Sequence, residues 1–227
     1  MRGPARTARR YDFHAHTYLT DGKESATSMW WAAARLGHRV LAITDHVALE
    51  DPKPILDRLF AESRAFEDGP VATLVGVELT LVPPKRIAEA ARAARAAGAQ
   101  IVIVHGETSA ERVPPGTNHA AVESGVIDVL AHPGLLTERD AELAVAHGTA
   151  LELSGRALHG RTNGHVARIA LAAGADLVVD SDAHATEQLL DFELAGTIAR
   201  GAGLTSSQVR RALEGAPGRL YHRLRNR

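Results

Sequence analysis

Two histidines separated by one residue, His14 and His16, lie close to the start of the chain. We predict that Tyr11–His14 forms a β-strand that ends at this pair. Because successive side chains of a strand point to opposite faces, the two imidazoles would lie on the same side. Imidazole is a common metal ligand, but histidine also serves as a buried hydrogen-bonding group and as an acid or base. The pair is therefore a candidate metal site whose interpretation depends on the rest of the chain.

Further histidines and carboxylates stand at the ends of other apolar stretches, or in the loop just after one. They are Asp21, His46, Glu78, His105, His132, Asp182 and His184. In α/β barrels and open α/β sheets the carboxyl ends of the strands meet at one rim, where active sites form. Each buried polar group without a partner costs roughly 1–3 kcal/mol, so gathering all of these groups without a cation would be unfavourable. We therefore predict a polynuclear metal centre.

The residues that must position this rim form a regular alternation of strand-like and helix-like segments. The predicted strands are Tyr11–His14, Val40–Thr44, Val71–Val77, Gln100–Val104, Ile127–Ala131, Thr149–Leu153 and Asp176–Asp180. The predicted helices are Ser25–Leu36, Pro52–Glu67, Pro83–Ala97, Thr137–His147, Asn163–Ala173, Thr186–Arg200 and Ser206–Leu213. Several of the strands are continuously apolar, which is typical of parallel strands covered by helices on both faces. The pattern predicts a fold of the α/β class.

Length and composition indicate one domain. The chain has 227 residues, and α/β barrels of roughly 200–250 residues commonly fold as one unit, so we expect a single domain over 11–227. Met1–Arg10 contains four arginines and no apolar segment follows it, which indicates a flexible basic arm rather than a secretory signal. The arginine-rich end, Arg219–Arg227, is expected to be solvated. No apolar run approaches the roughly 20 residues that a membrane-spanning helix needs.

Net charge and cysteine content restrict the class of binding partner and the identity of the metal ion that we expect. The formal net charge is −1, so the chain lacks the basic bias of a non-specific nucleic-acid binder. There is no cysteine, which suits a cytoplasmic protein and restricts a metal site to nitrogen and oxygen donors. Imidazole with carboxylate suits Zn²⁺, Mn²⁺ or Fe²⁺, whereas so many nitrogens disfavour Mg²⁺ and Ca²⁺. We expect zinc, with manganese or iron as the alternatives.

The order of the motifs, His-x-His, Asp, Thr-Asp-His, Glu, His, His-Pro and Asp-x-His, resembles the polymerase and histidinol phosphatase (PHP) superfamily of metal-dependent phosphoesterases. The resemblance extends from Tyr11 to about Leu190. The segments Val104–Thr108 and Thr162–Val166 are similar to a compact histidinol-phosphatase-like branch. The resemblance implies a distorted TIM-like (β/α)7 barrel with up to three metal ions, which agrees with the seven predicted strands.

The resemblance also implies how the ligands divide among three divalent ions. The first ion would be held by His14, His16, Glu78 and Asp182, the second by Glu78, His105 and His132, and the third by Asp21, His46 and His184. Glu78 would therefore bridge the first two ions. Among these ligands, we expect catalytic roles for Glu78, His105, Asp182 and His184.

The chemistry expected of such a centre is phosphate ester hydrolysis. A cluster of divalent ions activates a bound water and stabilises the attacking and leaving oxygens of an in-line displacement. Arg156, just after the sixth predicted strand, is expected to bind the phosphate, and His159 is a second substrate-binding candidate. We expect a phosphomonoesterase in which metal-bound hydroxide attacks a small phosphorylated metabolite, either similar to histidinol phosphate or a nucleotide.

Three alternatives remain open. A nuclease or phosphodiesterase acting on nucleic-acid ends is disfavoured by the near-neutral net charge. An amidohydrolase also begins with His-x-His, but that class usually has eight strands and a bridging modified lysine. A non-catalytic binding protein, similar to the metal-free barrel subunit of ribonuclease P, is disfavoured by the complete ligand set. No motif specifies the leaving group or the oligomeric state.

Overall fold

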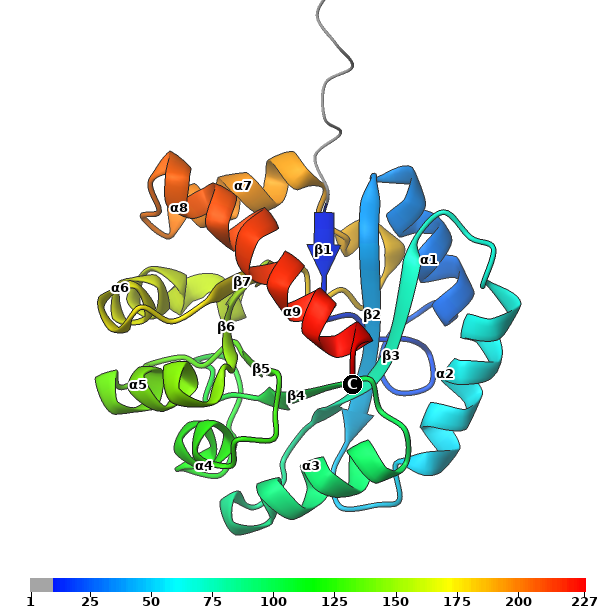
Figure 1. Ribbon diagram of the computed structural model, residues 1–227, viewed down its shortest axis with the longest axis horizontal. Helices are drawn as coiled ribbons and strands as arrows, with labels where there is room; N and C mark the ends of the chain where they lie inside the picture. Colours follow the sequence, from blue (N-terminus) through cyan, green and yellow to red (C-terminus); the bar gives the residue numbers. More distant parts are fainter. Residues whose placement is uncertain (1–9) are drawn as a thin grey trace, which may run out of the picture.

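Seven parallel strands follow one another in chain order around a barrel in the computed structural model, which describes residues 10–227. The strands are β1 (Arg10–Asp12), β2 (His38–Val47), β3 (Ala72–Leu79), β4 (Ile101–His105), β5 (Val129–Ala131), β6 (Ala150–Ser154) and β7 (Leu177–Asp180). Figure 1 shows the strands enclosed by a ring of helices. The predicted TIM-like (β/α)7 barrel is confirmed.

The barrel is nearly closed, because β1 and β7 meet through a short contact rather than a full ladder. Ala15 and Ala183, just beyond the ends of these two strands, form a single parallel bridge. The backbone N–H of His16 donates to the Ala183 carbonyl at 2.8 Å. The N–H of Phe13 donates to the Asp180 carboxylate at 2.9 Å. The segments that follow β1 and β7 therefore run side by side.

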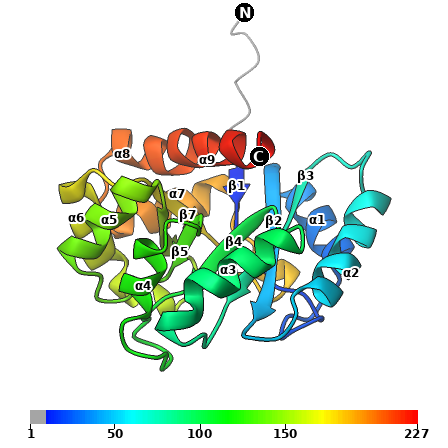
Figure 2. The ribbon, with the colours of Figure 1, turned by 60° about the horizontal axis from the view of Figure 1, so that its bottom comes forward.

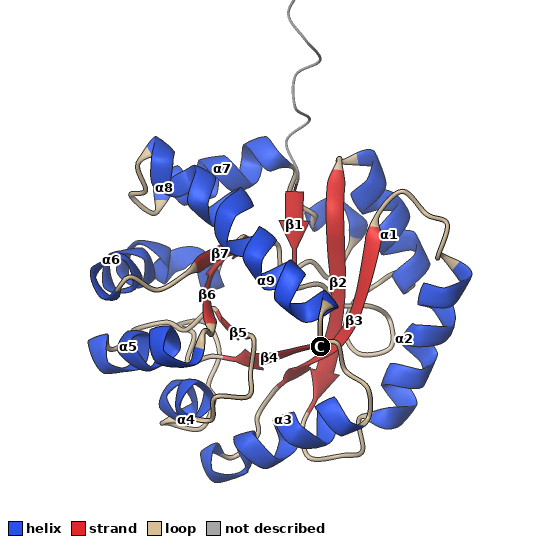
Figure 3. Ribbon diagram, in the orientation of Figure 1, coloured by secondary structure: helices blue, strands red, loops and turns tan. Residues whose placement is uncertain are grey.

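Helices form the outer layer (Figure 3). They are α1 (Ala26–Arg35), α2 (Lys53–Ala65), α3 (Ile87–Ala96), α4 (Thr117–Glu123), α5 (Glu138–His147), α6 (Asn163–Ala173), α7 (Phe192–Gly201), α8 (Ser206–Arg210) and α9 (Ala216–Arg225). Short 3-10 turns lie at Pro84–Arg86, His159–Thr162 and Thr186–Gln188, and a π-helical turn at Arg211–Gly215 joins α8 to α9. None of the helices within residues 10–227 is both long and apolar enough to cross a membrane.

Local sequence explains where these elements begin and end. The Thr137 side chain accepts a hydrogen bond from the Asp140 backbone N–H and so begins α5, which ends at Gly148 with a φ of 69°. A side-chain oxygen at the first position and a left-handed glycine at the last satisfy backbone groups that the helix leaves unpaired.

In the sheet, Gly76 of β3 lies so close to Ile101 that a methyl group would overlap its carbonyl oxygen. This close approach requires glycine.

The C-terminal end of the chain differs from the prediction. Arg219–Arg227 was expected to be solvated, but most of it belongs to α9, which lies across the end of the barrel where the strands begin (Figure 2). Leu220 and Leu224 of this helix are buried against the barrel. The prediction holds for Arg219, Arg225 and Arg227, which are exposed, and is wrong for Leu220 and Leu224, whose spacing on one helical face it did not consider. The short helix α4 was also not predicted.

The predicted N-terminal arm is placed only at its last residue. Residues 1–9 lie outside the described part of the chain. Arg10 belongs to β1, is buried, and pairs with Asp12 at 2.9 Å. Strand β1 therefore includes Arg10, one residue before the predicted strand Tyr11–His14.

Candidate metal centre

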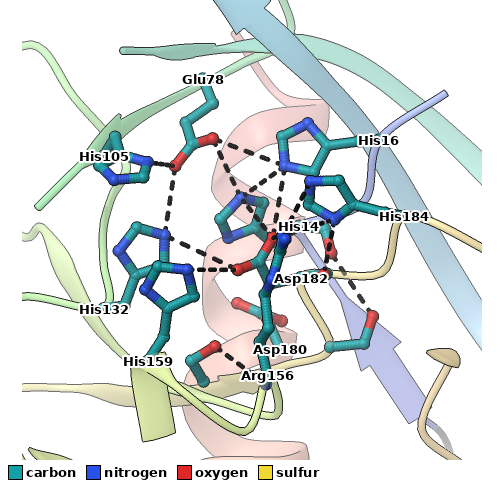
Figure 4. Close-up of polar contacts among 12 residues, drawn as sticks. His14, His16, Glu78, His105, His132, Arg156, His159, Asp180, Asp182 and His184 are labelled. Atoms are coloured by element: carbon teal, nitrogen blue, oxygen red, sulfur yellow. Dashed lines mark hydrogen bonds and ion pairs between the residues drawn. The ribbon is translucent and has the colours of Figure 1, made fainter. Parts of the chain in front are cut away.

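The nine side chains predicted to bind metal gather at the end of the barrel where the strands finish; all of them except Asp21 and His46 are labelled in Figure 4. They are His14, His16, Asp21, His46, Glu78, His105, His132, Asp182 and His184. Three of them lie on β2, β3 and β4, and the others lie in the segments that follow β1, β5 and β7. All are buried except Asp21, which is exposed, and His46, which is partly exposed. The structure therefore brings every predicted ligand to one rim.

The four donors predicted for the first ion face one another. Nε2 of His14 lies 3.4 Å from Oε2 of Glu78 and 3.7 Å from Oδ1 of Asp182. Nε2 of His16 lies 3.5 Å from each of the same two oxygens. The two imidazole nitrogens are 3.0 Å apart. Two nitrogens and two oxygens are thus directed at one small volume.

Glu78 faces the second predicted group through its other oxygen. Oε1 lies 3.3 Å from Nδ1 of His105 and 3.4 Å from Nε2 of His132. Oε2 also lies 2.9 Å from Nδ1 of His46. The Glu78 carboxylate therefore lies between the first two groups, which is the position that a bridging ligand requires.

The third predicted group joins the loop after β1 to β2 and to the segment after β7. Oδ2 of Asp21 lies 3.1 Å from Nε2 of His184, and its Oδ1 lies 3.5 Å from Nε2 of His46. His16 stacks on His46 with 4.2 Å between ring centroids, and its ligand atoms lie within reach of the same group. Because His16 and His46 each touch two groups, the nine side chains form one continuous cluster.

The carboxylates and imidazoles of this cluster shift one another's pKa. Burial alone would raise the pKa of Glu78, but the positive charges of His14 and His46 lower it well below its usual value. Burial alone would lower the pKa of His46, but the charge of Glu78 raises it to about 10. For His16, burial dominates and lowers the pKa to about 3. Protons on imidazoles therefore balance the carboxylates in the metal-free chain, and a bound cation would replace them.

The donor set fits a divalent cation because several of its atoms have no hydrogen-bond partner. Both carboxylate oxygens of Glu78 and Nδ1 of His105 are buried without a hydrogen bond. A carboxylate taken out of water is costly unless an opposite charge compensates it. Mixed nitrogen and oxygen donors are typical of zinc, manganese and iron sites. The residues present therefore suit divalent transition metals.

Two of the candidate ligands have strained backbones. The φ angle is 26° at His132 and 51° at Asp182, in the left-handed region that favours glycine. Such a conformation costs on the order of 1–3 kcal/mol and persists only where the surrounding structure enforces it. The strain lies at the two points where the chain turns away from β5 and β7 into the cluster.

Arg156, the predicted phosphate ligand, lies at the mouth of the cluster. Its side chain is 40% exposed. Nη1 lies 2.8 Å from both ring nitrogens of His184 and 3.6 Å from Oδ1 of Asp182. The guanidinium therefore borders a small polar pocket of about 30 Å³ that is lined by members of the cluster.

His159, the second predicted substrate-binding residue, is buried beside the cluster rather than exposed at the mouth. Its ring stacks on His132 with 4.2 Å between centroids, and Nδ1 lies 2.7 Å from the Thr108 hydroxyl oxygen. Burial lowers the pKa of His159 to about 3, so its ring is neutral. Nε2 lies 3.8 Å from Oδ2 of Asp182. This position suits an additional donor to the cluster as well as a substrate contact.

Two acids absent from the sequence-based prediction also reach the cluster. Glu152 of β6 is fully buried, and its Oε1 lies 2.7 Å from Nδ1 of His14. A lone carboxylate within an apolar strand is a signal that could have revealed it. Glu111 lies 3.4 Å from Nε2 of His105 and 3.6 Å from Nε2 of His159. Its position in an irregular loop gives no comparable signal.

Comparison with known sequences finds two relatives. The chain is 38% identical over 218 residues to the uncharacterized protein MJ1295 of Methanocaldococcus jannaschii, covering 95% of this chain and all of that protein. It is 30% identical over 215 residues to the DNA polymerase/3'-5' exonuclease PolX of Bacillus subtilis, covering 83% of this chain but 36% of PolX. No family model matches the chain.

Comparison with solved structures finds the same fold in distant proteins. Histidinol phosphate phosphatase from Lactococcus lactis, solved with zinc, L-histidinol and phosphate, matches with a TM-score of 0.61 and 14% identity, over 86% of this chain and 94% of that one. An amidohydrolase matches with the same TM-score, 0.61, and 12% identity, over 94% of this chain and 74% of that one. At these identities the likeness concerns the fold alone.

Proposed function

We propose that this chain, which belongs to the polymerase and histidinol phosphatase (PHP) superfamily and to the same family as MJ1295, is a metal-dependent phosphoesterase that hydrolyses small phosphomonoesters. The observation that carries the proposal is the position of Glu78. Its buried carboxylate lies within 3.5 Å of five imidazoles from four separate segments of the chain, namely His14, His16, His46, His105 and His132. Such a carboxylate suits a bridge between two ions.

Divalent ions held by this cluster would supply an activated water and positive charge for the phosphoryl oxygens. We propose three sites with zinc as the metal, as inferred from the ligand types. The side chains of Glu78, His105, Asp182 and His184 would hold the reacting groups in line. Their burial excludes bulk water, which strengthens electrostatic interactions within the site.

Arg156 would orient the phosphate. Its partly exposed guanidinium borders the pocket and can donate two hydrogen bonds to phosphoryl oxygens. The pocket is small, and its lining consists of imidazole, carboxylate and guanidinium side chains, so the phosphoryl end of a substrate suits it better than an alcohol part. The alcohol part would then lie outside, between Arg156 and Glu111. A terminal phosphate fits this arrangement better than a phosphate inside a chain.

A second candidate function is hydrolysis of a phosphodiester at a nucleic-acid end, which the similarity to PolX favours. The arginines of α9 do not support it, because this helix covers the end of the barrel where the strands begin, opposite the cluster (Figure 2). A nucleic-acid strand bound to them would lie away from Glu78. We therefore rank the phosphomonoesterase first.

The test is an activity screen of zinc- and manganese-loaded protein. The first set of substrates is phosphomonoesters, including histidinol phosphate and nucleoside monophosphates. The second set is phosphodiesters, namely a small diester and a single-stranded oligonucleotide. His14→Ala removes a predicted ligand, and His222→Ala, an exposed histidine of α9, is the matched control. We expect monoester hydrolysis in wild type and His222→Ala and none in His14→Ala. Hydrolysis of the diesters alone would favour the nuclease, and equal activity in His14→Ala would contradict both candidates.

A further inference from the structure

We propose that Glu152 is a positioning residue that orients two of the candidate metal ligands, His14 and His132, toward the cluster. The inference rests on the proposed metal-dependent function. Glu152 lies near the middle of β6 with no solvent exposure. Its Oε1 lies 2.7 Å from Nδ1 of His14, and its Oε2 accepts a hydrogen bond from the backbone N–H of His132 at 2.8 Å. One carboxylate thus contacts a ligand from each of the first two predicted groups.

The two nitrogens of His14 have separate partners. Nε2 faces Glu78 and Asp182 at 3.4 and 3.7 Å, whereas Nδ1 faces Glu152. A neutral imidazole has one N–H and one lone pair, and the hydrogen bond made by one nitrogen decides which of them the other presents. Donation of Nδ1–H to Glu152 therefore leaves the Nε2 lone pair directed at the centre of the cluster. This is how a carboxylate behind a histidine fixes the tautomer and orientation of a ligand.

At His132 the contact acts on the backbone. This residue has a φ of 26°, and its ring nitrogen Nε2 lies 3.4 Å from Oε1 of Glu78. The bond from its N–H to Glu152 holds the strained residue where the chain leaves β5. Without that bond the backbone can relax, which would move the ring away from Glu78.

Both contacts require a hydrogen-bond acceptor. Only a carboxylate offers an acceptor oxygen to each of the two N–H groups. A glutamine at position 152 offers one carbonyl oxygen and one NH2 group. If its oxygen accepts from His14, its NH2 group meets the N–H of His132, and the reverse placement turns NH2 toward His14. Glu152→Gln therefore preserves shape and volume but satisfies only one of the two donors. The variant separates an orienting role from a packing role.

Asp180 supplies a matched control. It is a second fully buried carboxylate inside the barrel, at the end of β7. Its Oδ1 accepts a hydrogen bond from the Phe13 N–H, and its Oδ2 has no partner. The amide of Asp180→Asn can reproduce this single bond. Asp180→Asn therefore removes a buried carboxylate from the barrel interior but leaves the contacts of Glu152 with His14 and His132 in place.

The test measures zinc affinity by competition with a chromophoric chelator, with unfolding temperature as the check on folding. We expect Glu152→Gln to bind zinc about tenfold to a hundredfold more weakly than wild type and Asp180→Asn to bind it as wild type does. Equal zinc affinity of Glu152→Gln and Asp180→Asn would overturn the proposal. Neither measurement uses turnover, so the proposal can fail while the proposed phosphatase activity stands.

A second measurement needs no variant. In zinc-loaded wild-type protein labelled with 15N at histidine, we expect His14 to carry its proton on Nδ1 and to bind zinc through Nε2. A His14 ring that binds zinc through Nδ1, or that lacks the Nδ1 proton, would overturn the proposal.

Discussion

Nε2 of His16 lies 3.5 Å from Oδ1 of Asp182, although the two residues follow the first and the last strand of the barrel. Closure of the sheet between β1 and β7 creates this contact, since Ala15 and Ala183 pair directly beside the two side chains. The candidate metal centre therefore depends on the completed barrel. A fragment lacking β7 would lose Asp182 and His184 together.

Glu78→Gln should remove metal and activity together. An amide has one oxygen and no charge, so it cannot bridge two ions or balance them. We expect the variant to retain at least one ion fewer per chain than wild type, measured by elemental analysis after desalting. Loss of a bridging ligand should reduce kcat by more than the roughly tenfold to hundredfold typical of an outer-shell partner. Glu89→Gln, at an exposed glutamate, is the control. Full metal content in Glu78→Gln would exclude the bridging role.

Arg156→Ala should raise KM for a phosphomonoester, because the guanidinium is expected to bind the phosphate. The metal content should change little. Hydrogen bonds to charged groups contribute about 1.5–3 kcal/mol, which is roughly a tenfold to hundredfold loss of kcat/KM. Arg156→Lys should recover part of this loss, since lysine keeps the charge but not the planar pair of donors. Steady-state kinetics with Arg168→Ala, at an exposed arginine of α6, as the control provide the measurement. An unchanged KM in Arg156→Ala would contradict a phosphate contact.

His38 should make the protein less stable as the pH falls. Burial, followed by the nearby Arg10 charge, lowers the pKa of His38 to about 4 in the folded chain, whereas an unfolded histidine titrates near 6.5. Between these values the unfolded state binds more protons, so the free energy of unfolding decreases from about pH 6.5 to pH 4. The contribution is at most about 3 kcal/mol.

His38→Gln tests this contribution. A glutamine keeps a donor for the Leu190 carbonyl, which Nε2 of His38 contacts at 2.8 Å, but it does not titrate. Urea unfolding of metal-free protein at several pH values should show a shallower decline in the variant. Parallel declines in both proteins would show that His38 does not contribute.

Gly76→Ala should destabilise the barrel. The new methyl group would overlap the carbonyl oxygen of Ile101 in the neighbouring strand, and overpacking of this kind typically costs about 1–3 kcal/mol or more. Gly201→Ala at the end of α7 has open space around the new methyl group and serves as the control. Thermal unfolding should show a lower Tm for Gly76→Ala alone. Equal values would contradict the close approach of β3 and β4.

Much of the fold and the gathering of the candidate ligands at one rim could be predicted from the sequence, because both follow from short-range patterns. Apolar runs ending in histidine or a carboxylate mark strands and their carboxyl ends, so Glu78 and His105 could be placed on one rim without a structure. The strand boundaries in the structure differ from the predicted ones by a few residues. Strand β2, for example, extends to Val47 and so includes His46.

The remaining features depend on three-dimensional contacts. The contact of Glu152 with His14 joins two residues far apart in sequence and has no motif. His16, which follows β1, and His46, near the end of β2, each belong to two groups and meet by ring stacking. The position of α9 depends on the apolar surface of the barrel that Leu220 and Leu224 cover. An interpretation that takes the sequence one strand at a time cannot predict these contacts, because they join residues that are distant in sequence.

The central claim is that donors from β3 and from the segments that follow β1 and β7 hold the same ion. Anomalous diffraction from crystals of zinc-loaded protein, recorded on both sides of the zinc absorption edge, tests it directly. We predict a peak about 2.0–2.2 Å from the ligand atoms of His14, His16, Glu78 and Asp182, with a second peak on the other side of the Glu78 carboxylate. The absence of a peak within this cluster, or zinc bound only elsewhere, would contradict the claim.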